Sequence, residues 1–253
     1  MRNMTKRMLA EGVSVSNDTW QTGLNNNDLI IGTSGTGKTR GYLLPNVLMA
    51  ENESMIITDT KGTLKDELSE KLKRKGYQVK CVDFTDCMNS CGYNPFDNIR
   101  FDKKRDCHVE QDILKIAACI VPIENYKDPF WDLAARQYLE AVIGYVLSCL
   151  PIREHNLTYV YKLFCEMSTG NFYKLMDEME ALEPDSFAVQ QYRLFRGTKT
   201  AEKMDASIKG VVGEKLELFS FDGAKKLFTN PKKIHFEDLR KEKTVVFLNV
   251  SDT

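Results

Sequence analysis

The sequence has no long hydrophobic run and no excess of charge of either sign. Its longest apolar stretch, residues 141–150, is about half the length that a helix needs to cross a bilayer. The basic N-terminal residues are not followed by an apolar segment, so we expect neither a membrane span nor a secretory signal peptide. The 35 Lys and Arg residues are balanced by 36 Asp and Glu residues, which gives a formal net charge of -1. This balance argues against a uniformly basic nucleic-acid binder, although it allows an oligomer with a locally basic channel.

Several familiar signatures are also missing. The N-K-x-D motif that reads guanine and the motifs of protein kinases do not occur, which argues against both classes of enzyme. The pair Cys87 and Cys91 is not accompanied by a C-x-x-C pair, and Cys107 and His108 are adjacent, so a zinc site is disfavoured. An odd number of cysteines, seven, in a chain of this size is typical of reduced thiols in a cytosol.

What the sequence does contain is a glycine-rich motif at residues 32–39 with the spacing G-x-x-x-x-G-K-[ST]. It follows an apolar run at residues 29–31, which we predict to be a strand, and it precedes a helix predicted to reach about Met49 with a bend at Pro45. Glycines allow the turn, successive N–H groups form an anion-binding nest, and the helix adds its positive dipole end. Lys38 is expected to reach the outer phosphates of a nucleotide.

The Thr39 hydroxyl is expected to bind Mg²⁺ at the same site. The alternative interpretation of the motif is a glycine-rich turn without a ligand, but the strand before it and the helix after it favour phosphate binding. We assign phosphate binding to Gly32, Thr33, Ser34, Gly35, Thr36, Gly37, Lys38, Thr39 and Arg40.

The pattern around this motif is that of an α/β protein. Residues 54–59 and 78–84 are predicted to be buried strands, and residues 63–76 between them a helix with leucines at four-residue spacing. We therefore predict that residues 28–84 fold as β-α-β-α-β, with parallel strands in a doubly wound sheet. A strong buried-strand pattern returns at residues 244–250.

The middle of the chain is predicted to be helical. Proline and glycine residues separate its helices, and none of them has a convincing strand pattern. The predicted helices are residues 103–121, 130–149, 156–168, 170–182, 186–196 and 200–220. We divide the chain into residues 1–102, the first part of a nucleotide-binding domain; residues 103–197, an inserted all-α domain; and residues 198–253, the return to the first domain.

An ATPase also needs an acid that holds Mg²⁺ or positions the attacking water, usually at the end of a strand beside the phosphate-binding loop. Asp59, Asp83 and Asp252 follow apolar stretches, but none completes the usual pattern of four apolar residues, Asp and Glu. Asp59 is the best placed, because doubly wound sheets bind ligands at the carboxyl ends of their strands. It is explained equally well as an acid that starts the next helix. Lys38 and Asp59 are the catalytic candidates, and hydrolysis of ATP by this chain alone stays open.

Further motifs occur in a fixed order around the glycine-rich loop. They are Asn25-Asn26-Asn27, Pro45-Asn46, Thr58-Asp59-Thr60-Lys61-Gly62, Tyr93-Asn94-Pro95-Phe96, Asp128-Pro129-Phe130-Trp131 and Ser207-Ile208-Lys209-Gly210. From about residue 10 to the end, this ordered set resembles the type IV coupling proteins, the TraG/TraD-like ATPases of conjugation.

The resemblance implies a RecA-like P-loop NTPase domain, with a mostly parallel sheet and an inserted all-α domain. Proteins of this family bind ATP between the subunits of a homo-hexamer at the cytoplasmic face of the bacterial cell membrane. They couple ATP hydrolysis to the transfer of single-stranded DNA and relaxosome proteins into the channel of a type IV secretion system.

The chain also departs from the family pattern. Thr63 stands where many members have the acid of a D-x-K-G-E motif, and the Walker B acids, the later sensor and arginine positions and the membrane helices of the family are not found. We therefore expect a central part of a coupling protein, truncated at both ends, with the ATPase activity belonging to the full-length parent.

Two alternatives stay open. A truncated chain that does not hydrolyse ATP would act only as an interaction module through its helical domain. An FtsK-like translocase of duplex DNA would share the glycine-rich loop, although the helical insert and the motifs at residues 94–95 and 130–131 argue against it.

Overall fold

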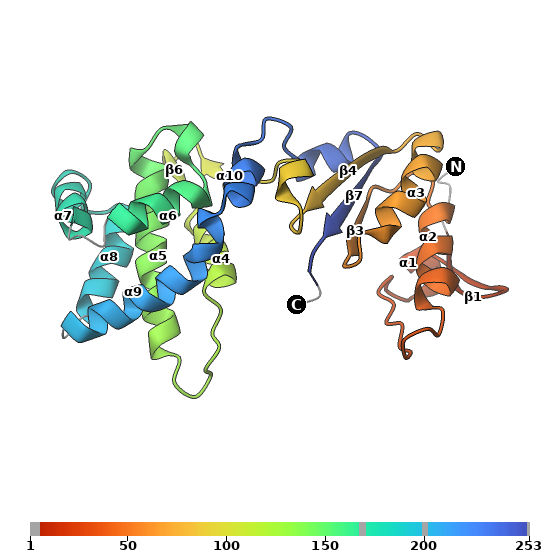
Figure 1. Cartoon of the computed structure of the whole chain (residues 1–253), viewed down its shortest axis with the longest axis horizontal. Coiled ribbons are helices and arrows are strands. Elements are labelled where there is room, and N and C mark those ends of the chain that lie inside the picture. The colour runs from red at the N-terminus through yellow and green to blue at the C-terminus, as the bar shows by residue number, and fades with distance from the viewer. Residues whose placement is uncertain (1–5, 167–170, 199–201, 252–253) are drawn as a thin grey trace. The chain divides into compact units, whose positions relative to one another are not determined.

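The computed structural model describes residues 6–166, 171–198 and 202–251, and the chain forms two compact units (Figure 1). The first unit comprises Met1–Thr85 and Phe236–Thr253, and the second comprises Asp86–His235. The domain limits predicted after residues 102 and 197 both lie inside the second unit, and that finer division stays a prediction.

Among the described residues, the first unit contains a three-stranded parallel sheet. Its strands are β3 (Met55–Asp59), β4 (Gln78–Asp83) and β7 (Thr244–Asn249). The last strand in the chain, β7, lies in the middle and pairs with both others. The strands predicted at residues 54–59, 78–84 and 244–250 are thus confirmed, as is their parallel pairing.

Two helices, α2 (Leu44–Met49) and α3 (Thr63–Arg74), cover one face of this sheet. The predicted helix after β3 is confirmed, and the leucines at four-residue spacing in α3 form its buried side because such residues share one face of a helix. The hydrophobic core between helices and sheet consists of Val47, Ile57, Leu64, Leu68, Leu72, Tyr77, Val245 and Phe247. This core packs α2, the helix that continues from the glycine-rich loop, against the sheet.

A small hairpin begins the described chain. It is formed by β1 (Lys6–Ala10) and β2 (Val13–Ser16), which pair antiparallel, and it is followed by the single turn of α1 (Thr19–Thr22). Gly12 allows the tight connection, since its φ of 72° is strained for residues with a side chain. The hairpin places Arg7 beside the segment that leads into the glycine-rich loop.

The strand predicted at residues 29–31 is wrong. Residues 28–33 form neither strand nor helix, and the side chains of Leu29 and Ile31 are 84% and 86% exposed. An apolar run becomes a strand only when a neighbouring strand pairs its backbone groups. Here the segment is held instead by the side chain of Asp28, which binds Arg7 and Tyr42.

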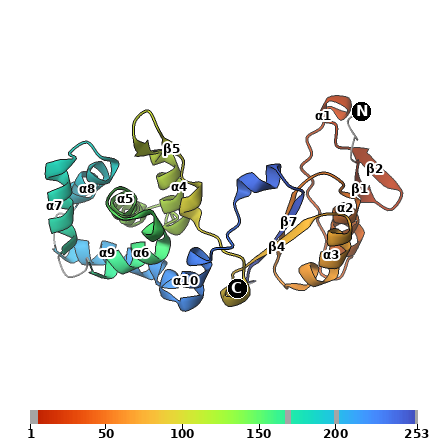
Figure 2. The ribbon, with the colours of Figure 1, turned by 90° about the horizontal axis from the view of Figure 1, so that it is seen from above.

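The second unit is mainly helical. Its helices are α4 (Glu110–Ile120), α5 (Phe130–Cys149), α6 (Leu157–Glu166), α7 (Phe172–Leu182), α8 (Phe187–Thr198), α9 (Glu202–Leu216) and α10 (Asp222–Thr229). The most buried of them, α5, is seen nearly end-on in Figure 2 with α4, α6, α8 and α9 around it. Gly144 allows close contact of α5 with α8, because a methyl group there would lie 2.9 Å from Cβ of Ala188.

The helix predicted at residues 103–121 is wrong in its first part. A hairpin of β5 (Phe101–Asp102) and β6 (Cys107–His108) comes first, and the helix begins only at Glu110. The turn is stabilised by Arg105, which binds the carboxylates of both Asp102 and Glu110. α10 was not predicted. The other predicted helices are confirmed. Some of their predicted ends lie in residues 167–170 and 199–201, which are outside the described part of the chain. Within the described ranges, no helix is long and apolar enough to cross a membrane.

Candidate functional site

The glycine-rich loop leads directly into a helix. A π-helical turn, η1 (Thr39–Leu43), begins at the end of the loop and continues without a break into α2. The predicted helix to Met49 is confirmed, and Pro45 lies in the first turn of α2, directly after the π-helical turn. The first N–H groups of a helix have no partner within the helix and carry its positive dipole end. The loop therefore ends at a group of backbone donors suited to bind an anion.

Three glycines are required by the geometry of the loop. Gly35 and Gly37 have φ angles of 78° and 85°, which favour glycine strongly. At Gly32 the backbone would accept a side chain, but a Cβ atom would lie only 2.6 Å from Oγ1 of Thr36. The hydroxyl of Thr36 donates to the carbonyl of Thr33 at 2.8 Å, which closes the turn. Each of the three glycines thus has a local reason to be glycine: a positive φ angle at two of them and a short contact at the third.

Lys38 folds back over this loop. Its Nζ atom donates to the carbonyl oxygen of Gly32 at 2.6 Å and to that of Thr33 at 2.7 Å. The side chain is exposed, so the ammonium group is accessible to a ligand while it is held at the loop. A cation held beside the first turn of a helix is an arrangement suited to bind the oxygens of a phosphate chain.

The remaining predicted ligand residues are accessible. The side chains of residues 32–40 are all exposed, including those of Thr39 and Arg40 in the first helical turn. No group of three or more His, Cys, Asp or Glu side chains that could hold a metal lies in the described ranges. Mg²⁺ commonly keeps several waters and takes one or two protein ligands together with phosphate oxygens. One hydroxyl, from Thr39, therefore fits a Mg²⁺ ion that would arrive with a nucleotide.

The carboxylate of Asp59 caps a helix. Its Oδ2 atom accepts hydrogen bonds from the backbone N–H of Leu64 at 2.8 Å and of Lys65 at 3.2 Å, and Asp59 is only 3% exposed. Between β3 and α3 the chain turns through Gly62, whose φ is 69°. Of the two interpretations of Asp59, this geometry favours the acid that starts a helix. Its catalytic role stays a prediction.

A second polar group lies at the same edge of the sheet. Asn249, at the end of β7, is in register with both Asp59 and Asp83 at the ends of the neighbouring strands. Its Nδ2 atom donates to Asp83 at 2.9 Å and to the hydroxyl of Thr85 at 3.1 Å. Asn249 was not predicted as a site residue, because a single amide after an apolar strand has no distinctive pattern.

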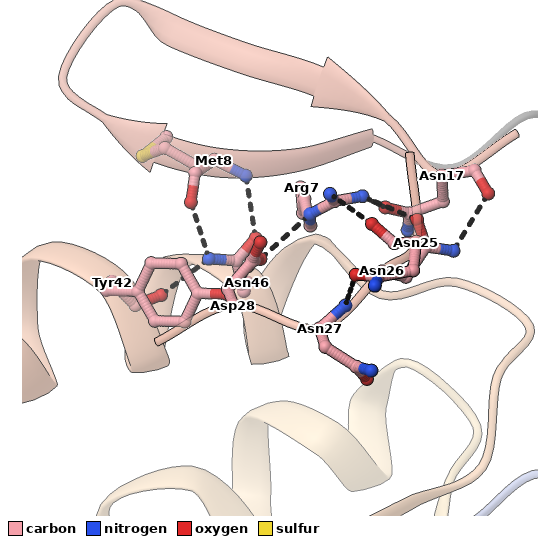
Figure 3. Close-up of polar contacts among 9 residues, drawn as sticks. All are labelled: Arg7, Met8, Asn17, Asn25, Asn26, Asn27, Asp28, Tyr42 and Asn46. Carbon is pink, nitrogen blue, oxygen red and sulfur yellow. Dashed lines mark hydrogen bonds and ion pairs between the residues drawn. The ribbon is translucent and has the colours of Figure 1, made fainter. Parts of the chain in front are cut away.

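A polar network joins the segment before the loop to the helix after it (Figure 3). This network was also not predicted from the sequence. Asp28 accepts a hydrogen bond from the Tyr42 hydroxyl at 2.5 Å and forms an ion pair with Arg7 at 2.8 Å. Burial, together with the hydrogen bond to Asp28, raises the pKa of Tyr42 to about 12. The hydroxyl therefore stays protonated, and stays a donor, throughout the physiological pH range. Two of its residues, Asn26 and Asn46, belong to the ordered set of motifs, but nothing in the sequence indicates that they contact Arg7 or Tyr42.

The sequence was compared with known protein families and with curated proteins. The sequence model of the family described as "Type IV secretory system Conjugative DNA transfer" matches residues 2–253. A search of curated proteins finds no match. The matched range includes the glycine-rich loop, Asp59 and the polar network, so all three belong to the part of the chain that the family model describes.

Proposed function

Since the chain belongs to the family of type IV secretory system conjugative DNA transfer proteins, the TraG/TraD-like coupling proteins, we propose that its first unit binds Mg²⁺-ATP at residues 32–39. In this proposal the loop N–H groups and Lys38 hold the phosphates, Thr39 contributes a ligand to Mg²⁺, and Arg40 adds positive charge at the first helical turn. Conjugative DNA transfer is the process to which the family belongs, and ATP binding is the step that we assign to this loop.

The observation that carries the proposal is the position of Lys38. Its ammonium group is fixed by the carbonyls of Gly32 and Thr33, at the start of the helix that follows the loop. The positive φ angles of Gly35 and Gly37 hold the backbone in the turn that brings these donors together. A glycine-rich turn at a helix start, with one cation held beside it, suits a triphosphate better than a neutral ligand.

The wider role follows from the family. We propose a RecA-like motor, with the parallel sheet as its nucleotide-binding part and the helical unit, Asp86–His235, as the part that meets DNA-processing partners. The proposed cargo is single-stranded DNA with relaxosome proteins, and the proposed assembly is a homo-hexamer beside a type IV secretion channel at the cytoplasmic face of the cell membrane. The membership of the chain in the family supports each of these points.

Calorimetric titration of the purified chain with ATP in the presence of Mg²⁺ tests the proposal. We expect saturable binding of one nucleotide per chain and competition by inorganic tripolyphosphate, because the loop binds the phosphates rather than the base. The absence of ATP binding in a folded chain would overturn the proposal.

A second candidate function, binding without hydrolysis, is favoured by the geometry of Asp59. Its Oδ2 atom accepts hydrogen bonds from the N–H groups of Leu64 and Lys65, so this oxygen is already used by the start of α3. Phosphate release measured on the same sample separates the two functions, since multiple turnovers would exclude a chain that only binds ATP.

A further inference from the structure

The two ends of the glycine-rich segment are tied together by side chains. Asp28 lies before the loop and Tyr42 lies in the helix after it, 14 residues further along the chain. The Tyr42 hydroxyl donates to Oδ2 of Asp28 at 2.5 Å, so one hydrogen bond closes the segment that contains the whole loop. Figure 3 shows the two side chains pointing toward one another from the two sides of this segment.

Arg7, in strand β1 of the N-terminal hairpin, also binds Asp28. Its Nε atom lies 2.8 Å from Oδ2 of Asp28, and the side chains of the two residues are only 12% and 15% exposed. The guanidinium also donates to Asn26, at 2.7 Å, and to Asn17, at 3.1 Å, and to the carbonyl of Asn25, at 3.2 Å. A largely buried ion pair with this many additional hydrogen bonds is costly to break, because either partner alone would stay desolvated.

Asn46 anchors the hairpin that carries Arg7. Its Oδ1 atom accepts from the backbone N–H of Met8 at 2.7 Å, and its Nδ2 atom donates to the carbonyl of the same residue at 2.8 Å. The amide thus pairs with β1 as a neighbouring strand would. Nδ2 also donates to the carbonyl of Tyr42 at 2.8 Å, which joins β1 to the helix after the loop.

This network is important because the sheet does not hold the start of the loop. Residues 28–33, all within the described ranges, form no strand, and Leu29 and Ile31 are almost fully exposed. The position of Gly32 relative to the helix therefore depends on Asp28, four residues earlier. A shift of Asp28 would move the Gly32 carbonyl, which is one of the two carbonyls that hold the Lys38 ammonium group.

We propose that Arg7, Asp28 and Tyr42 form a staple that sets the conformation of the glycine-rich loop, and that Asn46 holds the staple in place. They are positioning residues for nucleotide binding, since none of them belongs to the loop. The proposal rests on the ATP-binding function proposed above. Asn26 and Asn46, which belong to the ordered motifs of the sequence, contact Arg7 and Tyr42 of the staple.

The test compares two deletions of a single hydroxyl group. Tyr42→Phe removes the donor to Asp28, whereas Tyr77→Phe removes a hydroxyl of the same unit that is buried without a hydrogen-bond partner in the described structure. We expect Tyr42→Phe to weaken Mg²⁺-ATP binding about tenfold, as is typical for loss of a hydrogen bond to a charged group, and Tyr77→Phe to leave the affinity unchanged.

A double-mutant cycle separates positioning from general stability. Asp28→Asn and the double variant Asp28→Asn with Tyr42→Phe are titrated in parallel, and the thermal midpoint of each is recorded. If the staple acts as a unit, the double variant binds no more weakly than the weaker single variant. Should Asp28→Asn fail to fold, Tyr42→Phe and its control still decide the question.

The outcomes distinguish the two proposals. If the wild-type chain is folded and does not bind Mg²⁺-ATP, the proposed function fails. If the wild-type chain binds Mg²⁺-ATP and the Tyr42→Phe variant binds it equally well, the staple is overturned while the function stands. Equal weakening by Tyr42→Phe and Tyr77→Phe would also overturn the staple.

Discussion

The Lys38→Ala variant is expected to bind ATP so weakly that a titration detects no binding. The alanine removes the only ammonium group that the described structure places on the loop carbonyls, and with it the charge-assisted bonds that we propose to the outer phosphates. It also releases the carbonyls of Gly32 and Thr33 from the cation that holds them together. We expect the affinity to fall by about 100-fold or more, near the upper range for a hydrogen bond between charged groups.

A matched control is Lys71→Ala. Lys71 is an exposed lysine near the end of α3, in the same unit, and its replacement changes the net charge by the same amount. The Lys71→Ala variant should bind ATP with the affinity of the wild-type chain. An unchanged affinity in Lys38→Ala, or an equal loss in both variants, would contradict the assignment of the loop.

The second large effect is expected at Asp59. Replacing this residue by alanine leaves the N–H groups of Leu64 and Lys65 without their acceptor at a buried helix start. We expect the free energy of unfolding to fall by about 2 kcal/mol, the upper end of the range for loss of an N-terminal cap, because Asp59 is buried. Urea denaturation measures this change, and calorimetry of the folded variant should show nearly the wild-type affinity for ATP.

Comparison with Asp59→Asn separates a capping role of Asp59 from a catalytic one. The amide oxygen can still accept from the helix, and Asn is as good a cap as Asp, so most of the stability should be retained. If Asp59 is a catalytic acid, the Asn variant would instead lose ATP turnover while it stays folded. Unchanged stability in Asp59→Ala would contradict the capping role that the geometry assigns.

The sheet and helices could be predicted where local pattern and burial agree. β7 is a continuous apolar run that becomes the middle strand, and α3 carries its leucines on one face. The failure at residues 29–31 has a different cause, since Leu29, Ile30 and Ile31 are as apolar as any strand but lack a strand partner in the described structure. The pairing of a strand depends on distant residues, and sequence periodicity does not contain that information.

The residues of the candidate site also fall into two groups, those that local sequence predicts and those that depend on distant parts of the chain. The glycines and Lys38 were predictable because their geometry depends on neighbours within a few residues, as the bonds of Lys38 to Gly32 and Thr33 show. The ion pair between Arg7 and Asp28 joins residues on separate elements and leaves no spacing rule. Asp59 lies between the two cases, since the sequence placed it correctly at the end of a strand and only the structure shows what its carboxylate binds.

Hydrogen–deuterium exchange of the intact chain, with and without Mg²⁺-ATP, tests the central claim most directly, because it reports on the loop N–H groups themselves. We predict that ATP slows exchange in the peptides that cover residues 32–43, that inorganic tripolyphosphate has the same effect, and that Lys38→Ala shows neither. Exchange in this segment that is unchanged by a saturating concentration of ATP, or protection confined to the helical unit, would contradict the account.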